Sequence, residues 1–465
     1  MIEAKARVMI AGTASGSGKT TMSIALLAAL LTTGRKVVSF KCGPDYIDPM
    51  FHKKTTGVDS RNLDIFLMGE PAVKCSVHRQ EANCDIALME GVMGFYDGQG
   101  GGSFASSNHL SLLTGTPVVL AVNTKGAALS VCATIKGFQE FAENNIRAVI
   151  LNNTSPSSFP LYKQMVEEHT GLPVIGFLPP VPEAHLESRH LGLVTAAEIA
   201  DIQVKIEALK AAALEHIDID ALLRIAKTAE ALGCENDPII AARAEAEKSG
   251  RRVKLYVAED EAFSFFYRDN HELLEALGAE IATFSPLHDS ELPADADALI
   301  LWGGYPELHA AELASNTSMK ASLTKAIASG LPVYAECGGF MYLQESLTDS
   351  EGQTHEMLGV LPGQTKMTKG LKNFGYYEIE AREDNMLCKA GGTINAHFFH
   401  HSQGDNEGDS FIARKKNGKT LNCIVAQNNI FAGYQHLHFW GNPKFASNFI
   451  KATATYQASR NSQRT

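Results

Sequence analysis

Residues 7–33 constrain the fold of this chain most strongly, because they combine an apolar run, a glycine-rich loop and a helical pattern. The loop reads GTASGSGKTT. A strand, a glycine loop and a helix in this order are typical of phosphate-binding loops, whose usual spacing is G-x-x-x-x-G-K-[ST]. Here Thr13 stands where the first glycine is expected, and Gly12 lies one residue earlier. The spacing therefore predicts a phosphate-binding loop of unusual length.

The chemistry of such a loop assigns a role to each of its residues. Backbone N–H groups of the loop and the helix N-terminus face the phosphates of a nucleotide. We expect the Lys19 ammonium to reach the β- and γ-phosphates of ATP and the Thr20 hydroxyl to bind Mg²⁺. Thr13 is either a spacer or a hydroxyl donor to the γ-phosphate. The residues predicted to bind ATP here are Gly12, Thr13, Gly16, Gly18, Lys19 and Thr20.

Two series of apolar runs alternate with helical patterns. Because the runs are continuous, they are typical of parallel strands covered on both faces. We therefore predict an α/β fold with two doubly wound domains. The predicted strands are 7–12, 36–42, 85–91, 117–123, 148–153 and 173–179, and then 251–260, 280–286, 296–304 and 331–339. The helical patterns between them are 22–33, 129–145, 159–169, 261–278 and 308–329.

A change in composition marks the domain boundaries. Residues 1–200 form the predicted ATP-binding domain, and the Ala-, Glu- and Lys-rich residues 201–250 form a predicted helical linker. The second domain is predicted over 251–448, followed by a polar C-terminal tail at 449–465.

Charge and cysteine content exclude several classes of function. The net charge of −11 argues against nucleic acid as the main partner, since nucleic acids favour a basic face. No apolar run reaches the roughly 20 residues of a membrane span, so no membrane partner is expected. The eight cysteines form no C-x-x-C pair, so we expect neither zinc nor a disulfide framework. Reduced thiols and an N-terminus without a signal-peptide pattern predict a cytoplasmic protein.

Acidic residues follow the predicted strands that flank the glycine loop. Open α/β sheets bind ligands at the carboxyl ends of their strands. Carboxylates there commonly hold the Mg²⁺ of a nucleotide, although any one of them can equally be a solvated loop charge. The residues at these ends are Lys41, Asp45 and Asp48 in KCGPDYIDP, and Glu90 and Asp97 in LMEGVMGFYDG.

A second constellation lies in the C-terminal half. LPVYAECGGFMYL places Cys337 between a strand and a helix, which is the arrangement of a nucleophile elbow. Gly303 and Gly304 in LWGGYPELH are predicted to supply the oxyanion-hole N–H groups. GYQHLHFWGNP offers His436 and His438 as general bases.

These motifs carry a resemblance to known families. The longer loop spacing resembles the dethiobiotin-synthetase branch of P-loop proteins. The C-terminal pieces, with DEAFSFFY and FSPLHD, resemble class I glutamine amidotransferase domains, and by the Y-x-H pattern His436 is the preferred base. Together the two halves resemble the cobyrinate a,c-diamide synthase family. Its N-terminal motifs are matched by KCGPDYIDPMFH, SRNLDIFLM, MEGVMGFYDG and SRHLGL (188–193).

The resemblance implies a carbon–nitrogen ligase of cobalamin biosynthesis. ATP would activate the a and c acetate carboxylates of cobyrinic acid as acyl phosphates, and L-glutamine would supply ammonia through Cys337. It implies Mg²⁺ held by Thr20, Asp45 and Glu90. Other implied roles are ATP contacts by Asn152, contact with substrate or intermediate by Lys41, Tyr46, Asp48 and Asp97, and substrate carboxylates held by residues from the set Lys41, Arg61, Lys125 and Arg189.

Some alternatives stay open at the level of sequence. The same chemistry on hydrogenobyrinic acid or Ni-sirohydrochlorin fits the motifs equally, and a non-catalytic ATPase switch with a degenerate second domain is a remote alternative. The H-P-E ending of most class I domains is absent, since His438 stands where its glutamate would be. A Cys–His dyad or a carboxylate from elsewhere must serve. Phe398 likewise replaces a family glutamate, and His397 and His400 either line an interface or pack.

Overall fold

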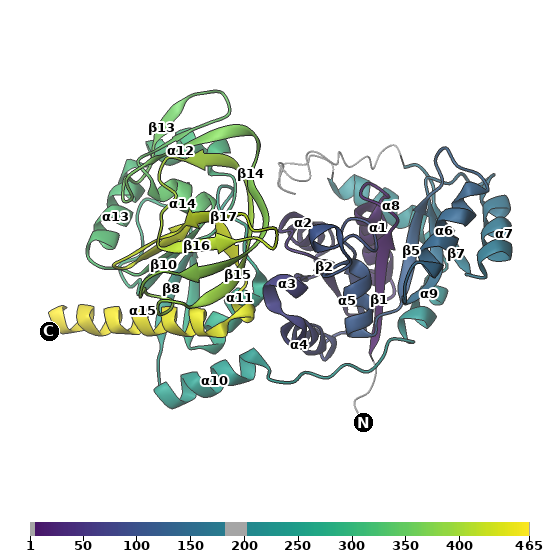
Figure 1. Cartoon of the computed structure of the whole chain (residues 1–465), viewed down its shortest axis with the longest axis horizontal. Coiled ribbons are helices and arrows are strands. Elements are labelled where there is room, and N and C mark those ends of the chain that lie inside the picture. Colours follow the sequence, from purple (N-terminus) through teal and green to yellow (C-terminus); the bar gives the residue numbers. More distant parts are fainter. Residues whose placement is uncertain (1–4, 182–201, 465) are drawn as a thin grey trace. The chain divides into compact units, whose positions relative to one another are not determined.

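The computed structural model describes residues 5–181 and 202–464. These fall into two compact units (Figure 1). The first comprises Met1–Ile65 and Gly69–Glu235, and the second comprises Phe66–Met68 and Asn236–Thr465.

A parallel seven-stranded sheet forms the centre of the first unit, in the order β3-β2-β4-β1-β5-β6-β7. All six strands predicted from the sequence are present. The additional strand β3 is short and polar, so its sequence carries no strand pattern. The strands are β1 (Ala6–Gly12), β2 (Val37–Cys42), β3 (Ser60–Leu63), β4 (Ile86–Glu90), β5 (Val118–Asn123), β6 (Ile146–Asn152) and β7 (Val174–Leu178).

Helices of the first unit pack on this sheet. Helix α1 is buried over most of its length, because it lies between the sheet and α8. These helices are α1 (Lys19–Leu31), α2 (Ile47–Thr56), α4 (Glu70–Glu81), α5 (Ser107–Thr114), α6 (Ser130–Glu140), α7 (Phe159–Thr170), α8 (Ile202–His216) and α9 (Ile219–Ala226). The short helix α3 (Ile65–Met68) falls mostly in the second unit.

The boundary between the two units lies inside the segment that was predicted to be a linker. Helices α8 and α9 join the core of the first unit through apolar side chains such as Leu209 and Leu222. The boundary between the units follows Glu235, and α10 (Pro238–Ser249) belongs to the second unit. Residues 449–464 of the predicted polar tail lie within α15 (Pro443–Arg464), the long yellow helix of Figure 1.

The second unit contains the predicted parallel sheet, in the order β18-β19-β11-β10-β8-β9. Only β18 runs antiparallel to its neighbour. Its strands are β8 (Val253–Ala258), β9 (Ala279–Phe284), β10 (Ala298–Leu301), β11 (Val333–Glu336), β18 (Val425–Gln427) and β19 (Ile430–Gly433). Its remaining helices are α11 (Arg268–Ala276), α12 (Ala310–Ser315), α13 (Thr317–Ala328) and α14 (Gly338–Leu343).

A further, mostly antiparallel sheet in the second unit was not predicted. Its main path is β13-β12-β14-β15-β20, with β16 beside β14 and β17 beside β16. Strand β15 pairs with β20, so that His397 lies opposite His436. The strands are β12 (Ser346–Thr348), β13 (Thr354–Glu356), β14 (Gln364–Ala381), β15 (Thr393–Gly404), β16 (Phe411–Arg414), β17 (Thr420–Cys423) and β20 (Gln435–Leu437).

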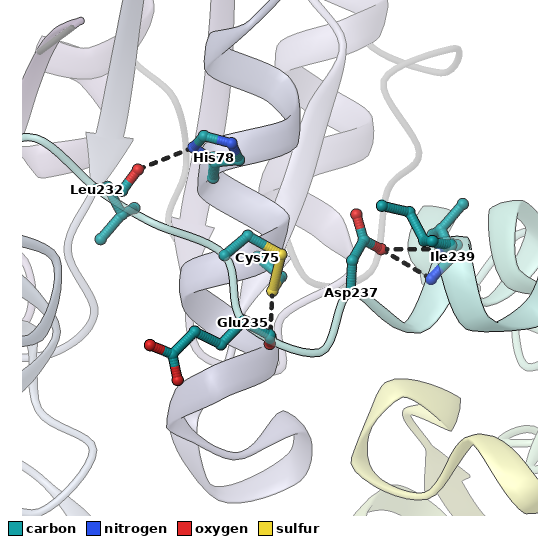
Figure 2. The surroundings of a disulfide bond; sticks show 8 residues. Cys75, His78, Leu232, Glu235, Asp237 and Ile239 are labelled. Atoms are coloured by element: carbon teal, nitrogen blue, oxygen red, sulfur yellow. Dashed lines mark hydrogen bonds between the residues drawn. A yellow bond between two sulfur atoms is a disulfide. The ribbon is translucent and has the colours of Figure 1, made fainter. Parts of the chain in front are cut away.

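A disulfide joins Cys75 on α4 to Cys234 in the segment after α9 (Figure 2). The expectation that all cysteines are reduced is therefore wrong for this pair. Nearby, the ring nitrogen Nδ1 of His78 lies 2.8 Å from the carbonyl oxygen of Leu232. Arg7 at the start of β1 donates to the carbonyl of Glu230 at 2.9 Å. The disulfide and these two contacts hold the segment after α9 against the first unit.

Among the described helices, none has the length and apolar character needed to cross a membrane.

Candidate active sites

The glycine loop connects β1 to α1 and has the geometry of a phosphate-binding loop. Gly16 and Gly18 have φ of 74° and 93°, the left-handed region that glycine adopts without strain. A Cβ atom on Gly12 would lie 2.0 Å from Ser17 Oγ, so the loop folds directly over the strand end. The ammonium of Lys19 donates to the carbonyl of Ala14 at 3.0 Å.

Asn152, at the end of β6, hydrogen-bonds to the backbone of this loop. Its Nδ2 donates to the carbonyl of Ser17 at 2.9 Å, and a Cβ on Gly18 would lie 2.0 Å from the same nitrogen. The amide therefore supports the loop backbone. Contact between Asn152 and ATP stays a prediction, as does the role of the Thr13 hydroxyl.

The carboxyl ends of β2 and β4 bring several of the predicted residues together beside the loop. Lys41 Nζ lies 2.7 Å from Glu90 Oε1 and forms an ion pair with Asp48. Thr20 Oγ1 donates to the same oxygen of Glu90 at 2.6 Å. His52 Nε2 lies 3.0 Å from the other oxygen, Oε2. Lys41 and Glu90 are both buried, so their charges interact with little screening by water.

Burial and charge together shift the pKa values in this cluster. Burial alone would raise the pKa of Glu90, but Lys41 and His52 outweigh it and hold that pKa well below its usual range. Burial alone would lower the pKa of Lys41, but Asp48 and Glu90 raise it well above normal. Burial raises the pKa of Asp48 to about 7, and burial together with Lys41 lowers the pKa of Lys19 to about 8.

The other predicted acids occupy loops at the same sheet edge. Asp45 Oδ1 accepts a hydrogen bond of 2.9 Å from the N–H of Ile47, at the start of α2. Asp97 Oδ2 accepts one of 2.8 Å from the N–H of Gly94. The side chain of Tyr46 is buried. In residues 5–181 and 202–464, no three His, Cys, Asp or Glu side chains are grouped to hold a metal ion. The Mg²⁺ site stays a prediction.

The basic residues considered for substrate carboxylates are dispersed. Arg61 lies on β3, with its backbone opposite Phe40. Lys125 is exposed just after β5. Arg189 and the SRHLGL motif lie outside the described residues.

In the second unit, Cys337 occupies the turn between β11 and α14 with φ 45° and ψ −101°. Few non-glycine residues adopt a positive φ, and such strain is common at catalytic positions. The backbone therefore turns sharply at Cys337, as in a nucleophile elbow, and the catalytic role of Cys337 stays a prediction. The two glycines that follow are required by space, since a Cβ on Gly339 would lie 2.2 Å from the carbonyl oxygen of Leu301, and one on Gly338 would lie 2.9 Å from Pro306 Cδ.

The loop after β10 passes close to this turn. A Cβ on Gly303 would lie 2.8 Å from His436 Cε1 and 3.6 Å from Cys337 Cβ. The backbone N of Gly304 lies 3.0 Å from the position that a Cβ on Gly338 would take. Both predicted oxyanion-hole residues thus border the elbow, and their function there stays a prediction.

His436 is the histidine that meets Cys337. A Cβ on Gly303 would lie close to both His436 Cε1 and Cys337 Cβ, and Nδ1 of His436 lies 3.1 Å from Glu336 Oε2. Burial alone would lower the pKa of His436, but the contacts with Cys337 and Glu336 outweigh it and raise that pKa to about 10. The ring of His438 packs instead against Tyr267, with the ring centres 4.9 Å apart.

His397 and His400 lie on β15 near His436. Burial, with a contribution from His436, lowers the pKa of His397 to about 3. Burial likewise lowers the pKa of His400 to about 4, and its ring stacks on Tyr434 at 3.9 Å. These lowered pKa values favour the neutral form of both rings, and the choice between an interface role and packing stays open.

Comparison with known proteins covers both units. Residues 8–194 match the model of the CobQ/CobB/MinD/ParA nucleotide binding domain, and residues 254–444 match the CobB/CobQ-like glutamine amidotransferase domain. Cobyrinate a,c-diamide synthase of Clostridium tetani is 41% identical over 443 residues, which cover 94% of this chain and 98% of the relative. That of Salmonella typhimurium is 40% identical over 452 residues, covering 96% and 97%. The chain belongs to the cobyrinate a,c-diamide synthase family.

In this member of the cobyrinate a,c-diamide synthase family, two residues of the sites were not predicted from the sequence. His52 closes the motif KCGPDYIDPMFH and contacts Glu90 from α2. Glu336 stands directly before Cys337 and contacts His436. The only signal in the sequence was their position within motifs already singled out for their neighbours.

Proposed function

We propose that this protein amidates the a and c acetate carboxylates of cobyrinic acid, using ATP to activate them and L-glutamine as the nitrogen source. The observation that carries the proposal is that one chain holds both halves of this chemistry. A phosphate-binding loop lies beside Lys41 and Glu90 in the first unit, and Cys337 meets His436 in the second. Relatives that match almost the full length of the chain are named cobyrinate a,c-diamide synthase.

The first unit would activate the carboxylate. A carboxylate does not form an amide with ammonia at neutral pH, because hydroxide is a poor leaving group. Attack of a substrate carboxylate oxygen on the γ-phosphorus of ATP breaks the bond to ADP and gives an acyl phosphate. Lys19 and Lys41 would stabilise the transferring phosphoryl group, which carries the developing charge.

The oxygen donors at the nucleotide site fit Mg²⁺. The hydroxyl of Thr20 and a carboxylate oxygen of Glu90 lie 2.6 Å apart, and hard oxygen ligands are those this ion prefers. Asp45 lies on the loop after β2 and would be a further donor. When bound, Mg²⁺ would reduce the negative charge of the phosphate oxygens.

The second unit would release ammonia. The sulfur of Cys337 attacks the side-chain amide of glutamine, the C–N bond breaks, and His436 gives the leaving nitrogen its proton. Water then hydrolyses the thioester to glutamate. Ammonia attacks the acyl phosphate, inorganic phosphate leaves, and an amide remains. Gly303 and Gly304 would donate N–H groups to the oxyanion formed at the amide carbon.

The exact tetrapyrrole is the finer part of the proposal. The protein is incubated with ATP, Mg²⁺, glutamine and, in separate reactions, cobyrinic acid, hydrogenobyrinic acid or Ni-sirohydrochlorin. Product masses are then read. We expect two amidations of cobyrinic acid. Diamidation of only one of the other two compounds would reassign the substrate, and no amidation of any of them would contradict the proposal.

A further inference from the structure

We propose that Glu336 is the positioning residue of the glutaminase site and fixes the ring of His436 so that its Nε2 faces Cys337. The inference rests on the proposed roles of Cys337 and His436. It supplies the carboxylate that the sequence lacks at position 438, where a histidine stands.

The carboxylate of Glu336 is fully engaged by its neighbours. Oε1 accepts a hydrogen bond of 3.0 Å from the backbone N–H of Leu437 and another from the hydroxyl of Tyr334. Oε2 lies 3.1 Å from Nδ1 of His436. Only 1% of Glu336 is exposed, so water does not compete for these contacts. An ionised carboxylate accepts hydrogen bonds and donates none, which suits the N–H of Leu437, the hydroxyl of Tyr334 and a protonated Nδ1 of His436.

This arrangement decides which nitrogen of His436 carries a proton. Because Glu336 Oε2 accepts, Nδ1 must donate. Nε2 is then the nitrogen that exchanges a proton with the sulfur of Cys337. When His436 takes that proton, the imidazolium forms beside a buried negative charge, which stabilises it. The contacts of His436 with both partners raise its pKa, in agreement with such an arrangement.

The backbone explains how the adjacent residues Glu336 and Cys337 contact opposite sides of the His436 ring. Tyr334 and Glu336 alternate along β11 and therefore lie on the same face of the strand. At Cys337 the backbone turns with φ 45°, so the side chain of Cys337 does not follow Tyr334 and Glu336 along that face. His436 comes from β20, and its neighbour Leu437 donates to the same carboxylate. Glu336 thus fixes both the ring and the backbone of the strand that carries it.

A structural role alone would also make Glu336 intolerant of change, so the test separates the two roles. Glu336→Gln keeps the shape of the side chain and removes its charge. We expect the glutaminase kcat to fall at least about 100-fold, as when the carboxylate of a catalytic triad is replaced by its amide. The glutamine KM should stay within about threefold, and synthesis with added ammonia should persist. Tyr334→Phe, which keeps the carboxylate, is the matched control and should lower kcat less than tenfold.

The outcomes distinguish this inference from the proposed function. If Cys337→Ala keeps glutaminase activity, the proposed function of the second unit fails. If Cys337→Ala loses it while Glu336→Gln keeps the full kcat, only the role of Glu336 is wrong. A rise in KM with unchanged kcat would also contradict that role.

A measurement on the unaltered protein covers the case in which the variant does not fold. ¹⁵N NMR of histidine-labelled protein, with the His436 signals assigned through a His436→Gln variant, reports which ring nitrogen is protonated. Because the pKa of His436 is raised to about 10, both nitrogens can carry a proton at pH 7, so the spectra are followed as the pH rises. We expect Nε2 to lose its proton first and Nδ1 to keep its own. Loss of the Nδ1 proton first would overturn the inference.

Discussion

The ammonium of Lys41 lies 2.7 Å from Oε1 of Glu90, and both side chains are buried at the carboxyl ends of neighbouring strands. The same oxygen accepts the hydroxyl proton of Thr20, the first threonine after the loop lysine. Glu90 therefore connects the phosphate-binding loop to the predicted substrate residues Lys41 and Asp48.

Replacing Lys41 with methionine tests this connection. We expect ATP-dependent amidation to fall by about 10²–10³-fold, because a preorganised positive charge is lost from the site. Removing one partner of a buried ion pair costs about 3–5 kcal/mol, so the thermal midpoint of the first unit should also fall. Glutaminase activity, measured as glutamate release, serves as the internal control. Unchanged synthesis would show that Lys41 does not act on the reacting groups.

Replacing Lys19 with alanine should remove synthesis with either glutamine or ammonia, because both routes require activation by ATP. The measurement is amide formation with each nitrogen source, together with ATP hydrolysis. Lys36→Ala, which changes an exposed lysine of the same unit that has no predicted role in the site, is the control. ATP-dependent amidation by the Lys19 variant would mean that the loop is not the nucleotide site.

A comparison of two histidines tests the choice of base. His436→Ala should lower the glutaminase kcat by roughly 10²–10⁴-fold, the usual contribution of a general base. His438→Ala removes a ring that packs on Tyr267, so we expect a loss of stability with a much smaller change in kcat. The reverse order of the two effects on kcat would identify His438 as the base.

The disulfide between Cys75 and Cys234 gives a prediction about stability. It closes a loop across 159 positions of the chain. A crosslink of this kind stabilises by about 2–5 kcal/mol. Calorimetry with and without dithiothreitol should show a lower unfolding temperature under reduction, and Cys75→Ser should match the reduced protein and not respond further. Equal unfolding temperatures for oxidised and reduced protein would contradict this.

The sequence predicts most strands of the two parallel sheets, because these are apolar runs, but it misses the polar β3 and also β18 and β19. It predicts the antiparallel sheet of the second unit poorly, since strands such as β14 are largely polar or half-exposed and resemble loops. The apolar positions of α8 are visible in the sequence, but the unit against which they pack follows only from the three-dimensional fold.

The residues of the two sites also differ in how far the sequence predicts them. Residues within one motif, such as Lys19 and Thr20, follow from spacing and known chemistry. The contact between Glu336 and His436 joins positions 100 residues apart, through strands of two different sheets. Position 438 holds no glutamate, and the motifs do not reveal the carboxylate beside His436, because it comes from another strand.

The central claim is that one chain separates ammonia production from carboxylate activation. The most direct test measures diamide formation from cobyrinic acid by Cys337→Ala, with ATP and either glutamine or ammonium chloride. The account predicts no product with glutamine and near wild-type synthesis with ammonia. Loss of the ammonia-dependent reaction in a folded variant, or retained synthesis with glutamine, would contradict it.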